Sequence, residues 1–449
     1  MTIPATTSEG DDGGWNRRVL ALAGPIILAN LSTPLLGAVD TAVVGHLPDP
    51  AAIGGVGIGS VIFSFLFWSF GFLRMGTTGF AAQAFGAGDH RELRLVLLRA
   101  LLLGLVLGLV ILLLQAPISL LAFGLLGASE AVESQALAYY ELRIFAAPFT
   151  LVNYCVLGWL LGTRRAGAAL ALQIVLNGIN ILLDLVFVIG LGWGIEGVAL
   201  ASVIAEAVAA LIGLGLVLRL EAGGPWPWSE VGHWEPLLAL LRVNFDIFVR
   251  TLSLIFAFAY FADQGARLGD TPLAGNQILQ QFQLFLAYGL DGFAHAAEIL
   301  AGNAKGARSR SDFRQVVRIS GLWALGLALV FALVFWLAGP ALIRLFTDHA
   351  EVRAAALAYL PWMIASPLVS VWSYQLDGIF IGTTRSGPLR NAMLLSVGLY
   401  LPACWLLVPW LGNHGLWLAL TLFMAARAVT LGLHYPGLLR SIGPERSAA

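Results

Sequence analysis

Long apolar runs recur along nearly the whole chain, and they constrain its fold more than any other feature. A helix needs about 20 consecutive, mainly apolar residues to cross a bilayer. Runs of that length, separated by short polar stretches, fill most of the 449 residues. Only 11% of the residues are charged, whereas soluble chains carry about 25%. The sequence therefore predicts an all-α membrane protein.

Twelve membrane helices are predicted, an even number that places both termini on the same side. The expected spans are residues 18–45, 52–82, 93–115, 136–161, 167–190, 195–218, 237–264, 273–301, 314–338, 353–381, 387–409 and 414–436. The first run follows Arg17-Arg18 and is too long for a cleaved signal segment, so we expect it to be the first membrane helix.

The distribution of Lys and Arg predicts on which side of the membrane the two termini lie. With the N-terminus in the cytoplasm, 18 of the 25 basic residues fall in cytoplasmic segments and only 3 fall outside. The other four, Arg74, Arg143, Arg250 and Arg427, lie within spans. Cytoplasmic loops of membrane proteins are enriched in Lys and Arg. We therefore expect a multi-pass protein of a bacterial inner membrane with both termini cytoplasmic.

The two halves of the sequence resemble each other at an offset of 220 in the numbering. Residues 82–87 match residues 302–307, and residues 162–167 match residues 382–387. Gly197 and Gly415 begin a further match at an offset of 218, as if one loop were slightly shorter. Such a repeat is typical of transporters, in which two similar lobes move against each other.

The repeat predicts the organisation of the chain. Two six-helix lobes should be related by a pseudo-two-fold axis along the membrane normal, because each contains an even number of spans. The expected segments are a cytoplasmic tail (1–17), a first lobe (18–218), a cytoplasmic linker (219–236), a second lobe (237–436) and a cytoplasmic tail (437–449).

Several function classes find no support in the sequence. The net charge of −1 offers no basic field for nucleic acid. The single lysine, Lys305, precedes Gly306 and not Ser or Thr, so the chain has no ATP-binding P-loop. The only Asp-Asp pair, Asp11-Asp12, lies in the N-terminal tail, which argues against a metal-dependent prenyl transferase. We expect no enzyme activity, no cofactor and no zinc site.

Ionisable residues within membrane spans are costly and mark candidate functional positions. Asp40 lies in the first span, and Asn180 and Asp184, four residues apart, share one face of the fifth. Ser202 lies at similar depth in the sixth span. Two carboxylates in a low dielectric repel unless one binds a proton or a cation neutralises them. We predict a cation-coupling site here, for H⁺ or for Na⁺ at Asp40, Asn180 and Asp184; separate pairing of the carboxylates with backbone or serine groups is the alternative.

A second polar network is predicted from further buried charges. Its members in the second lobe are Asp246, Arg250, Asp291, Glu298 and Asp377. Asp246 and Arg250 are four residues apart, which predicts an ion pair. The network either stabilises the lobe or takes part in transport. Glu206 shares a face with Ser202 and either extends the first site or serves packing, whereas His295 is expected to be a satisfied core residue.

Six segments resemble the multidrug and toxic compound extrusion (MATE) family, and most closely its DinF-type branch. They are Pro25–Asn30, Val39–Thr41, Gly71–Gly88, Gln264–Gly269, Gly289–Phe293 and Leu376–Gly382. The resemblance implies two six-helix lobes and export of amphipathic organic cations in exchange for H⁺ or Na⁺. It implies that Asp40 is the key coupling residue and that Asn180, Asp184 and the Ser202 hydroxyl complete its site.

The resemblance also bears on the second lobe. In the NorM-type branch, a tenth-helix aspartate corresponds to Asp377, but the seventh-helix glutamate of that branch has no clear counterpart here. A flippase for lipid-linked oligosaccharides is the alternative function, although such proteins usually line their cavity with basic residues. We expect a monomer in the lipid bilayer whose partner is a small organic cation, and no nucleic acid.

Overall fold

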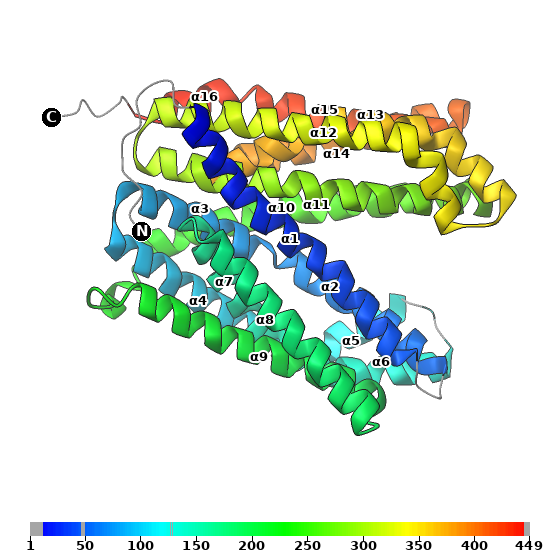
Figure 1. Ribbon diagram of the computed structural model, residues 1–449, viewed down its shortest axis with the longest axis horizontal. Helices are drawn as coiled ribbons and strands as arrows, with labels where there is room; N and C mark the ends of the chain where they lie inside the picture. Colours follow the sequence, from blue (N-terminus) through cyan, green and yellow to red (C-terminus); the bar gives the residue numbers. More distant parts are fainter. Residues whose placement is uncertain (1–11, 46–49, 126, 128, 444–449) are drawn as a thin grey trace. The chain divides into compact units, whose positions relative to one another are not determined.

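The computed structural model describes residues 12–45, 50–125, 127 and 129–443, and nearly all of them are helical (Figure 1). No strand occurs in these ranges. Eleven helical segments in them are long and apolar enough to cross a membrane. Helix α1 (Asp12–Val44), whose side chains are described only in part, adds a further helix of 33 residues. The all-α membrane fold predicted from the apolar runs is confirmed.

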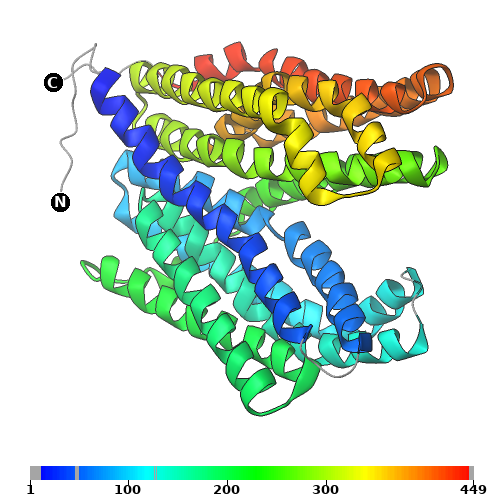
Figure 2. The same ribbon diagram turned by 45° about the vertical axis from the view of Figure 1, so that its right-hand side comes forward.

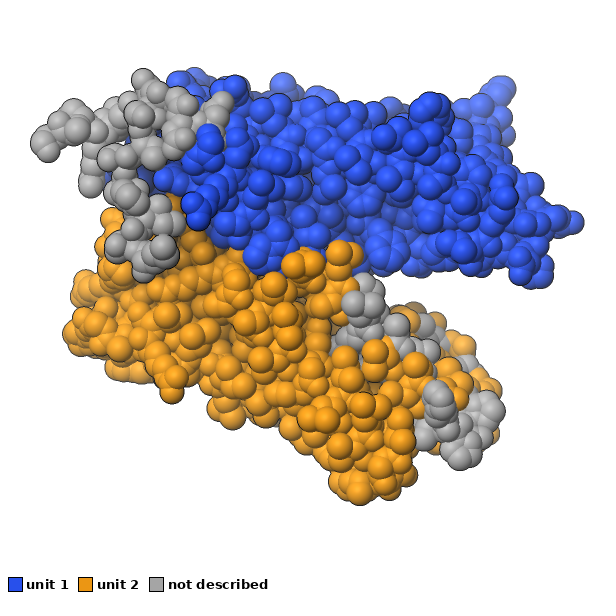
Figure 3. Space-filling view, in the orientation of Figure 1, with its two compact units in different colours: residues 1–27, 245–449 blue, residues 28–244 orange. Residues whose placement is uncertain are grey.

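The chain forms two compact units, which Figure 3 colours separately. We call residues 28–244 the N-lobe, and residues 1–27 together with 245–449 the C-lobe. The boundaries between the units fall inside two long helices, α1 and α10 (Trp234–Arg267). The sequence instead placed these boundaries at residue 18 and in the linker.

Contacts of the first turns of α1 explain the difference. The indole Nε1 of Trp323 donates a hydrogen bond to Oδ1 of Asn16 at 2.7 Å. Farther along α1, the side chain of Ile27 lies where a Cβ on Gly292 would be, so the two helices approach closely. The beginning of α1 is therefore packed into the C-lobe, although it precedes the N-lobe in the sequence.

Besides parts of α1 and α10, the N-lobe contains a series of further helical segments. They are α2 (Pro50–Ser69), α3 (Phe72–Ala87), α4 (His90–Leu113), α5 (Gln115–Leu125), α6 (Glu130–Arg143), η1 (Ile144–Ala146), α7 (Ala147–Gly162), α8 (Ala166–Asp184), η2 (Leu185–Gly190), α9 (Gly194–Leu220) and η3 (Trp228–Glu230).

The C-lobe consists of longer helices that run side by side in both views (Figures 1 and 2). They are α11 (Asp270–Gly306), α12 (Arg310–Phe346), α13 (Ala350–Gly382), α14 (Ser386–Leu411), α15 (Asn413–Gly432) and α16 (Tyr435–Ser441). The offset found in the sequence pairs α10 with α1, α11 with α2 and α3, α12 with α4 and α5, α13 with α6 through α7, and α14 with α8 and η2.

The repeat extends to the closest helix contacts. In the N-lobe, a Cβ on Gly158 of α7 would meet the backbone oxygen of Arg74 in α3. In the C-lobe, a Cβ on Gly378 of α13 would meet the backbone oxygen of Ala294 in α11. The repeat offset of 220 relates Gly158 to Gly378 and Arg74 to Ala294. In both lobes, small residues at equivalent positions thus allow two helices to approach closely.

The same offset relates two non-glycine residues with a left-handed backbone. They are Arg164, with a φ of 61°, and Thr384, with a φ of 52°. Each is the second residue after the end of a helix, α7 in the N-lobe and α13 in the C-lobe. The turns that follow these two helices are therefore alike as well.

Three breaks distinguish the N-lobe helices from their C-lobe counterparts. The predicted span 52–82 is two helices, separated at Phe70-Gly71 by a turn with short-range backbone hydrogen bonds. The chain turns again at Leu114, and the unpredicted helix α5 begins at the next residue, shortly before Pro117. The third break is the 3₁₀ turn η1, which precedes Pro148. Proline lacks an N–H group and cannot donate the hydrogen bond that continues an α-helix.

The segment predicted as a cytoplasmic linker is hydrogen-bonded to α4 of the N-lobe. Nη1 of Arg94 donates to the backbone oxygen of Pro225 at 2.9 Å, and Nε of the same side chain lies 3.4 Å from Glu221. Nη2 of Arg99 donates to the backbone oxygen of Glu230 at 3.3 Å. The residues between α9 and α10 therefore lie against α4 and belong to the N-lobe.

Candidate functional site

One face of helix α8 carries a row of polar side chains through an otherwise apolar helix. Its members, spaced four, three and four residues apart, are Gln173, Asn177, Asn180 and Asp184. Residues three and four apart lie on the same side of a helix. Asn180 and Asp184 were predicted as site residues from the sequence, whereas Gln173 and Asn177 were not, although their spacing continues the pattern.

Hydrogen bonds connect this row to two neighbouring helices. Nδ2 of Asn177 donates to Oγ of Ser32 on α1 at 3.0 Å. Nδ2 of Asn180 donates to Oγ of Ser202 on α9 at 3.2 Å. The structure thus brings together Asn180 and Ser202, two members of the predicted coupling site, and places α1 beside the same face.

The members of this site are deeply buried. Asn180 is 1% exposed, Asp184 is 0% exposed and Ser202 is 8% exposed. Oδ1 of Asn180 has no hydrogen-bond partner among the described residues. Asp40 belongs to helix α1, but its side chain lies outside the part of the chain that the structure describes. A carboxylate together with amide and hydroxyl oxygens is a set of hard ligands that suits a proton or a small hard cation.

The helix changes its geometry directly after Asp184. Residues Leu185–Gly190 form a π-helix, in which the backbone N–H of Leu191 bonds to the oxygen of Val186 at 2.9 Å. The rings of Phe187 and Trp193 stack at 4.8 Å beside it. Single π turns within helices are frequent at functional sites. The site therefore lies where α8 departs from regular α geometry.

Glu206 does not extend this row in the described contacts. Its Oε2 accepts a hydrogen bond from Nδ2 of Asn153 on α7 at 2.6 Å. Its Oε1 lies 3.9 Å from Nη2 of Arg143 at the end of α6. Glu206 therefore belongs to a separate polar cluster of the N-lobe.

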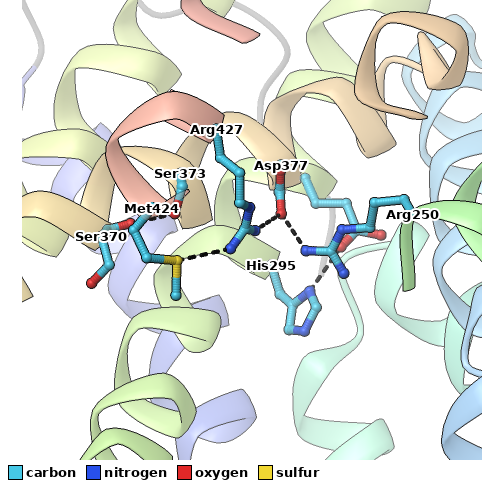
Figure 4. Close-up of polar contacts among 8 residues, drawn as sticks. Arg250, His295, Ser370, Ser373, Asp377, Met424 and Arg427 are labelled. Carbon is cyan, nitrogen blue, oxygen red and sulfur yellow. Dashed lines mark hydrogen bonds and ion pairs between the residues drawn. The ribbon is translucent and has the colours of Figure 1, made fainter. Parts of the chain in front are cut away.

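In the C-lobe, Asp377 is shared by two arginines (Figure 4). Nη2 of Arg427 donates to Oδ2 of Asp377 at 2.6 Å, and Nη2 of Arg250 donates to the same oxygen. All three residues are buried. Figure 4 shows the guanidinium groups reaching the carboxylate from opposite sides, from α10 and α15. Arg427 was counted among the buried charges but was not predicted to join this network.

The predicted ion pair between Asp246 and Arg250 is wrong. Oδ1 of Asp246 accepts from Nη1 of Arg390 at 2.6 Å, and its Oδ2 accepts from Oγ of Ser386 at 2.7 Å. Both partners are on α14, whereas Arg250 meets α13. Spacing along one helix permits a pair, but stronger hydrogen-bonding partners on neighbouring helices decide it.

The other members of the predicted network have partners within the C-lobe. Glu298 is 0% exposed, and its Oε2 lies 2.8 Å from Nδ1 of His295. His295 is therefore a satisfied core residue, as expected from the sequence. Asp291 interacts electrostatically with Arg250. The acids of this network are thus matched by basic groups of the same lobe.

The C-lobe positions equivalent to the α8 site carry neutral residues. At an offset of 220, Asp40, Asn180 and Asp184 correspond to Tyr260, Tyr400 and Cys404; at an offset of 218, Ser202 corresponds to Leu420. The rings of Tyr260 and Tyr400 make an edge contact at 6.0 Å. The fold therefore does not require carboxylates at these positions. Because packing does not explain them, the carboxylates of the N-lobe are functional candidates.

Comparison with known proteins identifies the family. The family model described as MatE matches residues 25–186 and 250–406. The chain is 44% identical over 436 residues to the DNA damage-inducible protein F of Escherichia coli (strain K12), covering 96% of this chain and 93% of that protein.

Solved structures show the same fold. A crystal structure of MATE in the bent conformation superposes with a TM-score of 0.86 at 19% identity, over 97% of this chain and 99% of that one. An outward-facing multidrug resistance MATE family transporter of the MOP superfamily gives 0.84 at 19% identity, over 98% and 99%. The two-lobed helical fold, the matched family model and the 44% identical relative together show that this chain is a membrane transporter of the MatE family.

Proposed function

We propose that this protein is a secondary active antiporter that exports amphipathic organic cations in exchange for H⁺ or Na⁺. The observation that carries the proposal is the buried α8 site, where the Asn180–Ser202 hydrogen bond lies one helical turn from the fully buried Asp184. Buried ionisable groups in membrane helices commonly mark ion pathways. Family relatives that carry multidrug resistance in their names support the class of cargo.

Coupling is proposed to reside at Asp40, Asn180, Asp184 and Ser202. Protonation of the carboxylates, or cation binding to them, rearranges the N-lobe and releases cargo to the outside. The site then empties, and cargo loads again from the cytoplasm. A ligand can shift such an equilibrium only by its difference in affinity for the two states. An ion held by two carboxylates in one state and hydrated in the other supplies that difference.

The ion pairs of the C-lobe support assigning coupling to the N-lobe. Asp377 already binds the guanidinium groups of Arg250 and Arg427, and Asp246 binds Arg390. These internal cations take the place that an exchangeable cation would need. We infer that the C-lobe network stabilises its lobe and carries no coupling ion.

We propose the orientation of the chain in the membrane from its charge distribution, and its oligomeric state from the presence of both lobes in one chain. Both termini face the cytoplasm of a bacterial inner membrane, since 18 of the 25 basic residues fall on that side. One chain contains both lobes. We propose that the monomer is the transporting unit and that it works within the lipid bilayer.

Transport into proteoliposomes tests the proposal. Ethidium movement is followed under a pH gradient alone and under a sodium gradient alone, with wild-type protein and with Asp40→Asn, Asp184→Asn and Glu133→Gln. Glu133 is an exposed carboxylate at the start of α6 and is the control. We expect gradient-driven transport by wild type and Glu133→Gln, and its loss in the two Asn variants. Wild-type rates in both Asn variants would refute the assignment of the site.

A further inference from the structure

The guanidinium of Arg143 in the N-lobe is held with few hydrogen bonds. Its Nη2 lies 3.9 Å from Oε1 of Glu206, and its Nη1 has no hydrogen-bond partner among the described residues. The group instead faces two aromatic rings, with centroid distances of 5.6 Å to Phe63 and 5.3 Å to Phe67. A well-formed arginine–carboxylate pair has shorter, paired hydrogen bonds. The negative charge of Glu206 and the faces of the two phenylalanine rings therefore hold the guanidinium in place.

The groups around Arg143 are fixed without it. Nδ2 of Asn153 donates both to Oε2 of Glu206, at 2.6 Å, and to its backbone oxygen, at 3.0 Å. The other carboxylate oxygen, Oε1, lies 3.9 Å from the guanidinium. The Phe63 ring stacks on Tyr140 with a centroid distance of 5.5 Å. A carboxylate oxygen and two ring faces are thus preorganised around one small cationic group.

The repeat relates two of the residues around Arg143 to residues that line a small cavity in the C-lobe. At an offset of 220, Arg143 corresponds to Met363 and Phe63 to Gln283; at an offset of 218, Glu206 corresponds to Met424. Gln283 and Met424 line a cavity of about 10 Å³ in the C-lobe. A hollow of this size holds about one water molecule. In the N-lobe, the counterparts of these two lining residues, Phe63 and Glu206, face the guanidinium of Arg143.

We propose that Glu206, Phe63 and Phe67 form a binding subsite for the cationic group of an organic-cation cargo, and that Arg143 occupies this subsite in the present structure. A carboxylate and aromatic faces are the contacts that recognise organic cations. Cargo and Arg143 compete for them, and the long contact between Arg143 and Glu206 makes the exchange feasible. The proposal rests on the proposed export of organic cations and names where in the N-lobe their charge is recognised.

Binding of tetraphenylphosphonium to the purified full chain in lipid nanodiscs tests the subsite. Arg143→Met removes the competing cation and introduces the residue found at the equivalent C-lobe position, whereas Arg143→Lys retains a cation. We expect Arg143→Met to bind about tenfold more tightly than wild type and Arg143→Lys to bind like wild type. Adding Glu206→Gln to Arg143→Met should abolish the gain, because the carboxylate is lost.

Three results would overturn the subsite. One is a folded Arg143→Met variant that binds no more tightly than wild type, and another is a gain that persists after Glu206→Gln is added. If Arg143→Met does not fold, Phe67→Leu decides: about fivefold weaker binding is expected, and unchanged binding overturns the subsite. Ethidium export by wild-type proteoliposomes separates this outcome from failure of the proposed function, which would abolish export altogether.

Discussion

The side-chain amide of Asn180 donates a hydrogen bond to the hydroxyl of Ser202 at 3.2 Å, and this bond connects α8 to α9 beside the fully buried Asp184. It holds two helices of the N-lobe at the depth where coupling is proposed. In an apolar interior, an amide that loses its acceptor costs more than the bond itself contributes.

Ser202→Ala should therefore weaken both the lobe and the site. We expect a loss of about 1–3 kcal/mol in the free energy of unfolding, since the amide of Asn180 stays buried without its acceptor. Ser202→Thr retains the hydroxyl and should behave like wild type. Thermal unfolding in detergent and ethidium efflux from cells measure the two effects. Equal stability and efflux for the Ala and Thr variants would contradict this role of the hydroxyl.

The C-lobe charge cluster should behave as a structural unit. Asp377→Ala leaves Arg250 and Arg427 buried without their shared carboxylate, and breaking such a pair costs about 3–5 kcal/mol. We expect poor yields of folded protein, measured by size-exclusion chromatography of the solubilised chain.

Removing the two arginines together with the carboxylate that they share should reverse that loss. Replacing buried ion pairs by apolar residues of similar volume is often neutral or stabilising by about 1–4 kcal/mol. We expect the triple variant Arg250→Met, Asp377→Leu, Arg427→Met to fold and to retain gradient-driven ethidium transport. A folded triple variant without coupling would show that this cluster takes part in transport.

The close helix contacts of the repeat predict paired effects of single methyl groups. A Cβ on Gly378 meets the backbone of Ala294, and one on Gly158 meets the backbone of Arg74. Backbone atoms cannot move aside, so Gly378→Ala and Gly158→Ala should each destabilise their lobe by about 1–3 kcal/mol.

Gly387 in α14 is the matched control, because nothing lies within 4 Å of a Cβ there. Gly387→Ala should be neutral or stabilise by about 0.5–1 kcal/mol, since alanine is the better helix former. Thermal midpoints of the three variants provide the comparison. Similar midpoints for Gly378→Ala and Gly387→Ala would refute the close packing of α11 against α13.

The segment between α9 and α10 should be released when its buried ion pair is broken. Arg94 and Glu221 are both buried, whereas Arg91, which pairs with Glu230, is exposed. Glu221→Gln should increase chymotryptic cleavage after Trp228 by about tenfold, equivalent to about 1.4 kcal/mol. Arg91→Ala should change cleavage little, because exposed pairs contribute about 0–1 kcal/mol. Identical cleavage of both variants would show that the buried pair does not hold the segment.

Much of the fold was predictable because the bilayer leaves the backbone few choices. Without water, every backbone N–H and C=O needs an internal partner, so long apolar runs become helices. The sequence repeat that relates Gly158 to Gly378 likewise predicted two similar lobes, and both glycines make the same kind of contact. The polar spacing of Asn180 and Asp184 predicted their common face.

The tertiary structure decided how the parts are partnered. Asp246 and Arg250 satisfy the spacing rule for an ion pair, yet each binds a different helix, because several neighbours compete for every buried charge. Contacts of Asn16 and Ile27 assign the beginning of α1 to the C-lobe. A sequence specifies which residues share a helix face, since that depends on local periodicity. Which distant side chain meets that face depends on how the helices pack, and only the folded chain determines it.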